Sequence, residues 1–174
     1  LPADVHGLGV GVADLDADGR ADLFVAGSNR LFVRDGERFR EETSPVFAWE
    51  AFGDEDDVAG VAVGDLDGDG RPDLVLGQHY NSTLDAGRRV PVRVYLNAGP
   101  GDGRRVTFRD VTDEVGIVDL PTKAPHVEVV DVDSDGRLDI VTGAATAGGG
   151  RPVLFRGTGR GGVGRDGGLG FEAI

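Results

Sequence analysis

The sequence contains no cysteine, no methionine, a single tryptophan and only 6% aromatic residues in 174 positions. Without cysteine the chain forms no disulfide and has no thiol chemistry, which leaves the redox compartment open. No apolar run approaches the roughly 18 residues of a membrane-spanning helix, and no signal-peptide pattern opens the chain. Because translation starts with methionine, we expect Leu1 to follow a processing site or to lie inside a longer chain.

Basic residues are also scarce. The 18 Lys and Arg stand against 31 Asp and Glu, and the formal net charge is −13. This balance argues against a nucleic-acid partner or an anionic membrane, both of which favour a basic surface. The nucleophile motif G-x-S-x-G and the phosphate-binding motif G-x-x-x-x-G-K-[ST] are absent. We therefore predict that the chain is not an enzyme by itself.

Glycine, in contrast, is abundant, with 30 residues and no collagen-like period. Such a content is typical of many tight turns between short strands. Together with the scarcity of long apolar runs, it favours an all-β fold.

One acidic pattern of nine residues occurs three times, at 14–22, 65–73 and 131–139. Each copy has aspartate at positions 1, 3, 5 and 9, glycine at position 6 and arginine at position 7. Carboxylates this crowded repel one another unless a cation with oxygen ligands lies between them, and Ca²⁺ fits best. Glycine at position 6 permits a sharp turn with positive φ. The sequence therefore predicts three Ca²⁺ sites.

The predicted ligands are the aspartate side chains and the backbone carbonyl at position 7, which points inward in loops of this kind. The aspartates are Asp14, Asp16, Asp18, Asp22, Asp65, Asp67, Asp69, Asp73, Asp131, Asp133, Asp135 and Asp139, and the carbonyls belong to Arg20, Arg71 and Arg137. The arginine side chains either offset the negative field of their loop or pair with a neighbouring blade. Twelve of the 31 acidic residues lie in these loops, and three Ca²⁺ ions would bring the charge from −13 to −7.

The EF-hand is the nearest alternative for an Asp-x-Asp-x-Asp-Gly string, but it requires a bidentate glutamate at position 12 and a helix on each side. Position 12 holds Val25, Leu76 and Thr142 here, and the flanking residues alternate as strands do. The pattern favours a loop between two β-strands.

The three loops begin 51 and then 66 residues apart, a period typical of propeller blades. We predict repeats over 1–43, 44–111 and 112–174, each with four strands. The expected strands are 8–13, 22–26, 30–34 and 38–43, then 58–64, 73–77, 90–96 and 106–111, then 126–130, 139–142, 152–156 and 169–174. The glycine-rich connectors 143–150 and 157–168 are expected to be mobile.

The first strand of each unit carries valines on one face, at Val10/Val12, Val61/Val63 and Val127/Val129, and small residues on the other face in the first two units. Small residues suit an innermost strand that neighbouring blades approach closely. Glu128 breaks this pattern in the third unit. It faces either a central channel or solvent at an open edge.

Three strings of the second unit, G-V-A-V-G-D-L-D-G-D-G-R-P-D-L-V-L-G, V-Y-L-N-A-G and T-F-R-D-V-T-D-E-V-G-I, resemble the FG-GAP/VCBS repeat family. This family includes the integrin α-chain propeller and propellers similar to cartilage acidic protein. The resemblance implies a β-propeller with Ca²⁺ between the first two strands of each blade, located outside the cell or at its surface. Because closed propellers have about four to eight blades, three blades imply a partial propeller, three of about six to eight. A longer chain or a second copy would supply the others.

The resemblance leaves two functions open. The first is an extracellular interaction or adhesion module for a protein or glycan. The alternative is an accessory or structural domain of a larger secreted enzyme, for instance one that acts on polysaccharides. Two loops are candidate contact surfaces: 44–57, where Trp49 either joins a recognition rim with Phe47 and Phe52 or packs between blades, and 79–89.

Overall fold

The computed structural model describes residues 1–42, 44–47, 57–79, 92–118, 123–145 and 152–174. They form three four-stranded antiparallel sheets, which confirms the all-β prediction. We call them blades 1, 2 and 3. Blade 1 contains β1 (Gly7–Ala13), β2 (Asp22–Gly27), β3 (Arg30–Asp35) and β4 (Arg38–Glu42); blade 2 contains β5 (Asp57–Gly64), β6 (Asp73–His79), β7 (Arg93–Gly101) and β8 (Arg104–Asp110); blade 3 contains β9 (Lys123–Val130), β10 (Asp139–Ala145), β11 (Leu154–Gly157) and β12 (Phe171–Ala173).

Each blade is a meander in which every strand pairs with the next one along the chain. Short turns make this possible. The turn between β7 and β8 has positive φ at both Asp102 (51°) and Gly103 (74°), the combination that lets two antiparallel strands join with their natural twist. Three short 3₁₀ helices, η1 (Pro45–Phe47), η2 (Thr112–Glu114) and η3 (Arg165–Gly167), lie outside the sheets.

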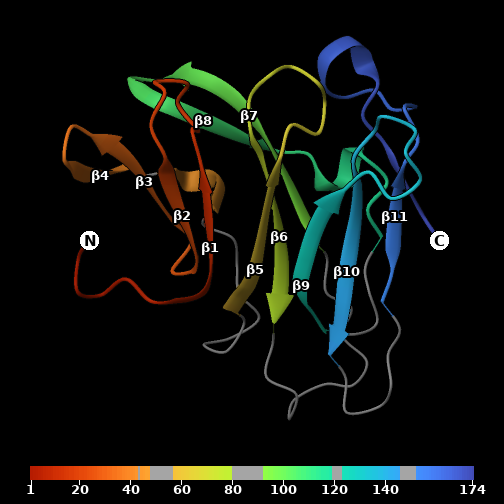
Figure 1. Ribbon diagram of the computed structural model, residues 1–174, viewed down its shortest axis with the longest axis horizontal. Helices are drawn as coiled ribbons and strands as arrows, with labels where there is room; N and C mark the ends of the chain where they lie inside the picture. Colours follow the sequence, from red (N-terminus) through yellow and green to blue (C-terminus); the bar gives the residue numbers. More distant parts are fainter. Residues whose placement is uncertain (43, 48–56, 80–91, 119–122, 146–151) are drawn as a thin grey trace.

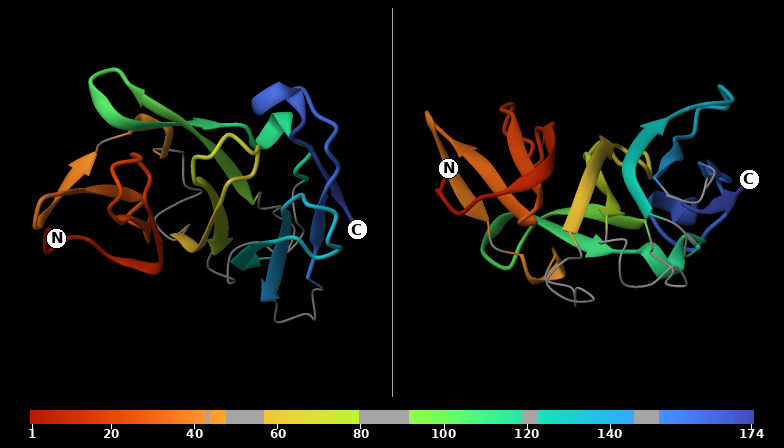
Figure 2. Two further views of the ribbon diagram at one scale, coloured as in Figure 1. Left: turned by 45° about the horizontal axis from the view of Figure 1, so that its top comes forward. Right: turned by 90° about the horizontal axis from the view of Figure 1, so that it is seen from below.

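The three blades stand next to one another in sequence order, with β1, β5 and β9 as neighbouring strands (Figures 1 and 2). Small residues allow this close approach. A Cβ added to Gly11 of β1 would lie 3.1 Å from a methyl carbon of both Val61 and Val63, and one added to Gly64 would lie 2.9 Å from Val129. The close approach at the small face agrees with the sequence analysis, and the structure adds that this face receives the valine face of the next blade.

Two apolar cores fill the spaces between the blades. Between blades 1 and 2, the ring of Phe47 contacts Phe24, Tyr95 and Phe108 with centroid separations of 4.9 to 5.5 Å. Between blades 2 and 3, the core includes buried residues of both sheets and of the segment that follows η2. The blades are thus held together mainly by apolar burial.

At the two ends of the row of blades, the first strands β1 and β9 each present an open face among the described residues. On β1 the valine face is open, with Val10 55% and Val12 57% exposed. On β9 the opposite face is open, and Glu128 is exposed there. Glu128 therefore lies at an open edge, the second of the two positions expected for it.

The connector 157–168 departs from the mobile segment that its glycine content predicts. Val163 and Leu169 are both buried, and they form an isolated β-bridge with an N–H···O bond of 2.9 Å from Leu169 to Val163. The valine side chain supplies the apolar anchor that glycine counting overlooks. Of the other connector, 143–145 belongs to β10 and 146–151 lies outside the described residues.

Candidate metal centre

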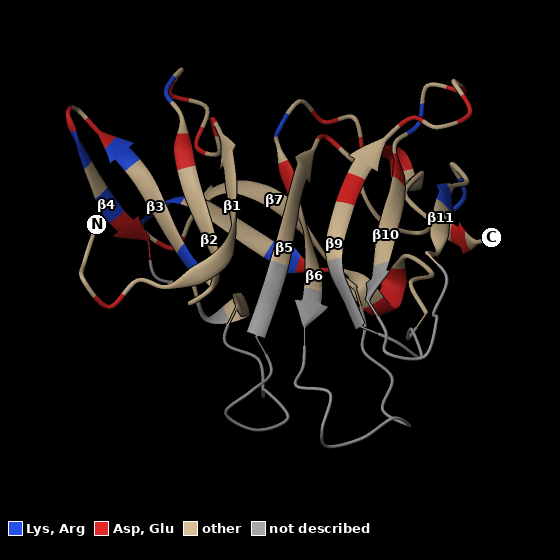
Figure 3. Cartoon of the chain, turned by 60° about the horizontal axis from the view of Figure 1, so that its bottom comes forward, with Lys and Arg blue, Asp and Glu red and all other residues tan. Residues whose placement is uncertain are grey.

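The three acidic loops lie at the same edge of the molecule, each between the first and second strands of its blade (Figure 3). The aspartate at position 1 curls each loop by accepting two backbone N–H groups. In the second loop, Asp65 Oδ1 accepts the N–H of Asp69 at 3.0 Å, and Oδ2 accepts that of Gly70 at 2.9 Å. Asp14 and Asp131 accept the equivalent bonds at 2.8 to 3.0 Å.

Two positions in each loop adopt the left-handed backbone conformation. The glycine at position 6 has φ of 84° to 88° in all three loops, as predicted. Position 4 also has positive φ, at Ala17 (60°), Gly68 (74°) and Ser134 (61°). The sequence analysis misses this second turn, because alanine and serine occupy position 4 in the first and third loops. Gly68 is the one signal for it, since only glycine adopts such a conformation without cost.

The aspartate at position 9 is buried and joins three segments of its blade. Asp73 is 1% exposed; its Oδ2 accepts the N–H of Leu66 at 2.8 Å, and its Oδ1 accepts the N–H of Asn97 on β7 at 2.8 Å. Asp22 and Asp139 make the same pair of bonds. A carboxylate has about four lone-pair sites, so each of these groups keeps capacity to bind a cation.

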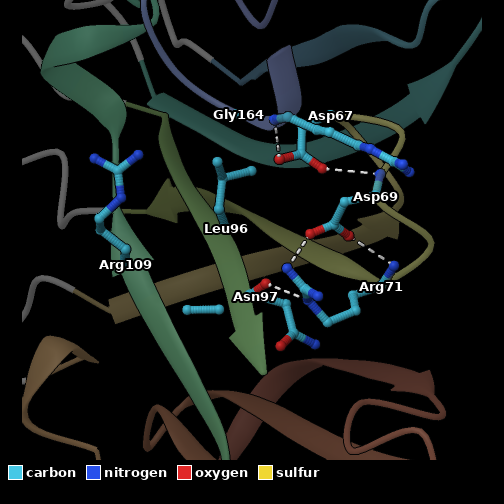
Figure 4. A pocket seen from close by; sticks show the side chains of 9 residues that line it. Asp67, Asp69, Arg71, Leu96, Asn97, Arg109 and Gly164 are labelled. Carbon is cyan, nitrogen blue, oxygen red and sulfur yellow. Dashed lines mark hydrogen bonds and ion pairs between the residues drawn. The ribbon is translucent and has the colours of Figure 1, made fainter. Parts of the chain in front are cut away.

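The arginine at position 7 turns its side chain back onto the aspartate at position 5. Arg71 pairs with Asp69 and donates from Nε to the carbonyl oxygen of Asn97 at 2.8 Å (Figure 4). Arg20 pairs with Asp18 and Arg137 with Asp135 in the same way. The side chain thus offsets the negative field of its own loop, the first of the two predicted roles, and the partners described for it all belong to its own blade. The ligand role of the carbonyl at position 7 stays a prediction.

Carboxylate oxygens from three aspartates gather within 4.8 Å of one another in every loop. In the second and third loops, the gathered positions are 1, 3 and 9; in the first loop they are 1, 3 and 5. The groups are Asp65, Asp67 and Asp73, then Asp131, Asp133 and Asp139, then Asp14, Asp16 and Asp18. Asp69, Asp135 and Asp22 stand outside these groups, and their role as the fourth side-chain ligand of each site stays a prediction. Arginine engages the carboxylates of Asp69 and Asp135, as it also does that of Asp18, and three backbone N–H groups donate to that of Asp22.

Charge and burial compete at these carboxylates. Burial raises the pKa of the Asp73 carboxyl to about 7 against the opposing effect of the N–H groups of Asn97 and Leu66, and the charges of Asp67 and Asp69 add to the rise. Burial likewise raises the pKa of Asp16. Such crowding is the situation that a bound cation relieves, and a donor set made only of carboxylate oxygens suits a hard cation such as Ca²⁺.

Two residues outside the pattern also contact the loops from a neighbouring blade. Asn97 Nδ2 of blade 2 donates to the carbonyl oxygen of Leu15 at 2.8 Å, and Arg105 of the same blade pairs with Asp16 and Asp18. Asn97 belongs to the V-Y-L-N-A-G string. Arg105 has no signal in the sequence, because its contact depends on how two blades pack.

Family comparison places the first two loops in a known repeat. The model of the FG-GAP-like repeat matches residues 14–76, and the model of the FG-GAP repeat matches residues 58–95. Residues 14–95 are FG-GAP repeats. Searches of curated proteins and of solved structures gave no significant match. The third loop lies outside the matched residues but has the same aspartate skeleton and the same hydrogen bonds as the two FG-GAP loops.

The other predicted surfaces are only partly described. Phe47 is 4% exposed and belongs to the core between blades 1 and 2, so it does not form a recognition rim. Trp49, Phe52 and the loop 80–89 lie outside the described residues. Among the residues that the structure describes, no helix is long and apolar enough to cross a membrane.

Proposed function

We propose that this chain is a calcium-binding FG-GAP β-propeller segment that acts outside the cell, or at its surface, as a module for binding a protein or glycan. The observation that supports metal binding is the gathering of three carboxylates within 4.8 Å in every one of three loops. Without a cation, the repulsion between these carboxylates destabilises the fold. By mass action, a cation that binds only the folded state adds about 2.7 kcal/mol of stability per site at a free concentration of 100 Kd.

The donor chemistry favours Ca²⁺ over Mg²⁺. Ca²⁺ accepts about six to eight oxygen ligands in a flexible arrangement, whereas Mg²⁺ demands a near-ideal octahedron and keeps several waters, so a set of several loop carboxylates suits Ca²⁺ better. Because the same carboxylates also accept backbone N–H bonds, they serve structure rather than acid–base chemistry, and we propose no catalytic role for them.

The test is thermal unfolding of the whole chain with and without chelator. Removal of Ca²⁺ should lower Tm, and added Ca²⁺ should restore it more fully than the same concentration of Mg²⁺. A Tm that does not respond to chelator would contradict the metal assignment.

The interaction role needs a separate experiment. The chain, immobilised on beads, should retain members of a panel of purified glycans and extracellular-matrix proteins in Ca²⁺ and release them in chelator. A panel that shows no retention in either condition would count against an interaction module.

A further inference from the structure

The first acidic loop carries an ion pair from the neighbouring blade, which the other two loops lack among the described residues. The guanidinium of Arg105, on β8 of blade 2, lies against two carboxylates of the first loop. Nε is 2.6 Å from Asp16 Oδ2, and Nη2 pairs with Asp18 Oδ2. Nη1 donates to the carbonyl oxygen of Arg34 at 3.0 Å. The guanidinium is therefore held at three points on blade 1.

Little water separates these charges. The side chain of Asp16 is 1% exposed, and that of Arg105 is 30% exposed. Charges in contact at a partly buried site interact more strongly than charges in bulk water and are less screened by salt. Arg105 therefore offsets part of the negative charge that would otherwise attract a metal ion to this loop.

The second loop allows a comparison at the equivalent atom, Oδ2 of the aspartate at position 3. Asp67 Oδ2 also receives a donor from the next blade, but this donor is the uncharged backbone N–H of Arg165, at 2.9 Å. The guanidinium of Arg165 is exposed and, among the described residues, reaches only the carbonyl oxygen of Gly68, at 3.5 Å. The aspartate at position 3 thus contacts the adjacent blade in both loops. The partner is the charged guanidinium of Arg105 in the first loop and an uncharged backbone N–H in the second.

The arrangement of carboxylates differs in parallel. Where Arg105 is present, the gathered group contains Asp18 and lacks the buried Asp22; in the second loop it contains the buried Asp73 and lacks Asp69. The first loop therefore offers a divalent cation both less net negative charge and a different set of oxygens.

We propose that Arg105 is a tethered cation that weakens divalent-metal binding at the first loop, so that the first loop fills after the second and its occupancy responds to the contact between blades 1 and 2. This inference rests on the proposed function, because it requires that the loops bind a cation. Coupling between two binding events is reciprocal. Ca²⁺ at the first loop should therefore loosen the hold of Arg105 on blade 1.

Calorimetric titration of Ca²⁺ into the full chain would test this. Asp65→Asn with Asp131→Asn leaves the first loop as the only intact site, and Arg105→Gln is compared on that background. We expect Ca²⁺ to bind about tenfold more tightly after Arg105→Gln. Arg38→Gln removes the same charge from the exposed surface of β4 and should change the affinity far less, whereas Arg105→Lys should retain weak binding.

The difference in the Tm deficit between chelator and saturating Ca²⁺ gives a second readout, which a merely structural role of Arg105 would not change. In chelator, Arg105→Gln should lower Tm, because the carboxylates lose their compensating charge; in saturating Ca²⁺ the deficit should shrink. An equal deficit in both conditions, or unchanged or weaker Ca²⁺ binding at the first loop, would overturn the inference without bearing on metal binding at the second loop, which is measured on the unaltered chain. Absence of binding at every loop would overturn the proposed function as well.

Discussion

Asp73 combines two conditions that conflict when no cation is present. Its carboxylate is needed to hold Leu66 and Asn97 in place, yet it is 1% exposed and close to two other aspartates. Burial favours the neutral acid, whereas the two N–H donors favour the charged form. The balance makes Asp73 a residue at which pH, metal binding and folding are linked.

We predict that the free energy of unfolding of the chelated protein falls as pH rises from about 4 to about 7. The pKa of Asp73 is about 7 in the folded chain against an ordinary value of 3.8. The unfolded chain therefore loses this proton first, and the contribution of the protonated group, complete below about pH 4, disappears as pH approaches 7. Tm measured in chelator between about pH 4 and pH 7 should show the decline, and Asp73→Asn should reduce the slope of Tm against pH. Asp113→Asn, an exposed acidic residue outside the loops, is the control; equal slopes for both variants would contradict the assignment.

A single ligand should matter to a single site. Asp67 belongs to the gathered carboxylates of the second loop only. Asp67→Ala should therefore leave two bound Ca²⁺ ions where the unaltered chain has three, counted by native mass spectrometry. Asp113→Ala should keep all three. Loss of every ion in the Asp67 variant would indicate that the three sites do not act separately.

At the scale of strands and loops, much of the structure follows from local chemistry. The strands β2, β6 and β10 begin at Asp22, Asp73 and Asp139, as predicted, because the last aspartate of each loop is anchored by backbone N–H groups. Alternating valines and small residues likewise predict which face of β1 and β5 meets a neighbour. These features depend on residues close in sequence.

Other features depend on contacts that a sequence pattern does not contain. The prediction ends β7 at Leu96, before a Gly-Pro pair, but the strand continues to Gly101. Irregular pairing around Gly99 accommodates the extra residues, and Thr107 Oγ1 donates to its carbonyl oxygen at 2.8 Å. The contact between Arg105 and Asp16 also joins residues of different blades, so no local spacing indicates it.

The close approach of blades makes a prediction for Gly64. Because an added Cβ would lie 2.9 Å from Val129 Cγ1 and 3.1 Å from Leu138 Cδ1, Gly64→Leu should separate blades 2 and 3 and destabilise the fold by about 1 to 3 kcal/mol. Denaturant unfolding measures the change. Val130→Leu is a matched control, since Val130 occupies the same position at the end of β9 and is 44% exposed. Similar effects of both substitutions would argue against tight packing at Gly64.

For the molecule as a whole, the two outer faces are chemically unequal. Blade 1 presents Leu8, Val10 and Val12, which are 72%, 55% and 57% exposed, whereas the equivalent valines of blade 2 lie against Gly11 of blade 1. Blade 3 presents Glu128 and Val130 where the other blades have small residues. Blade 1 thus exposes a valine face, but blade 3 lacks the face of small residues against which such valines pack between the other blades.

This mismatch predicts weak self-association through blade 1. An exposed apolar face favours contact with another surface, yet Glu128 would lose hydration against Val10 or Val12 of a second copy arranged head to tail, which limits the gain. Sedimentation should therefore show a mass that rises above 18.1 kDa only at high protein concentration. Val10→Lys with Val12→Lys should abolish the rise, whereas Val118→Lys, on a residue 50% exposed elsewhere, should not. Glu128→Ala should strengthen association if the two ends meet. A rise that survives the valine substitutions would place the contact on another surface.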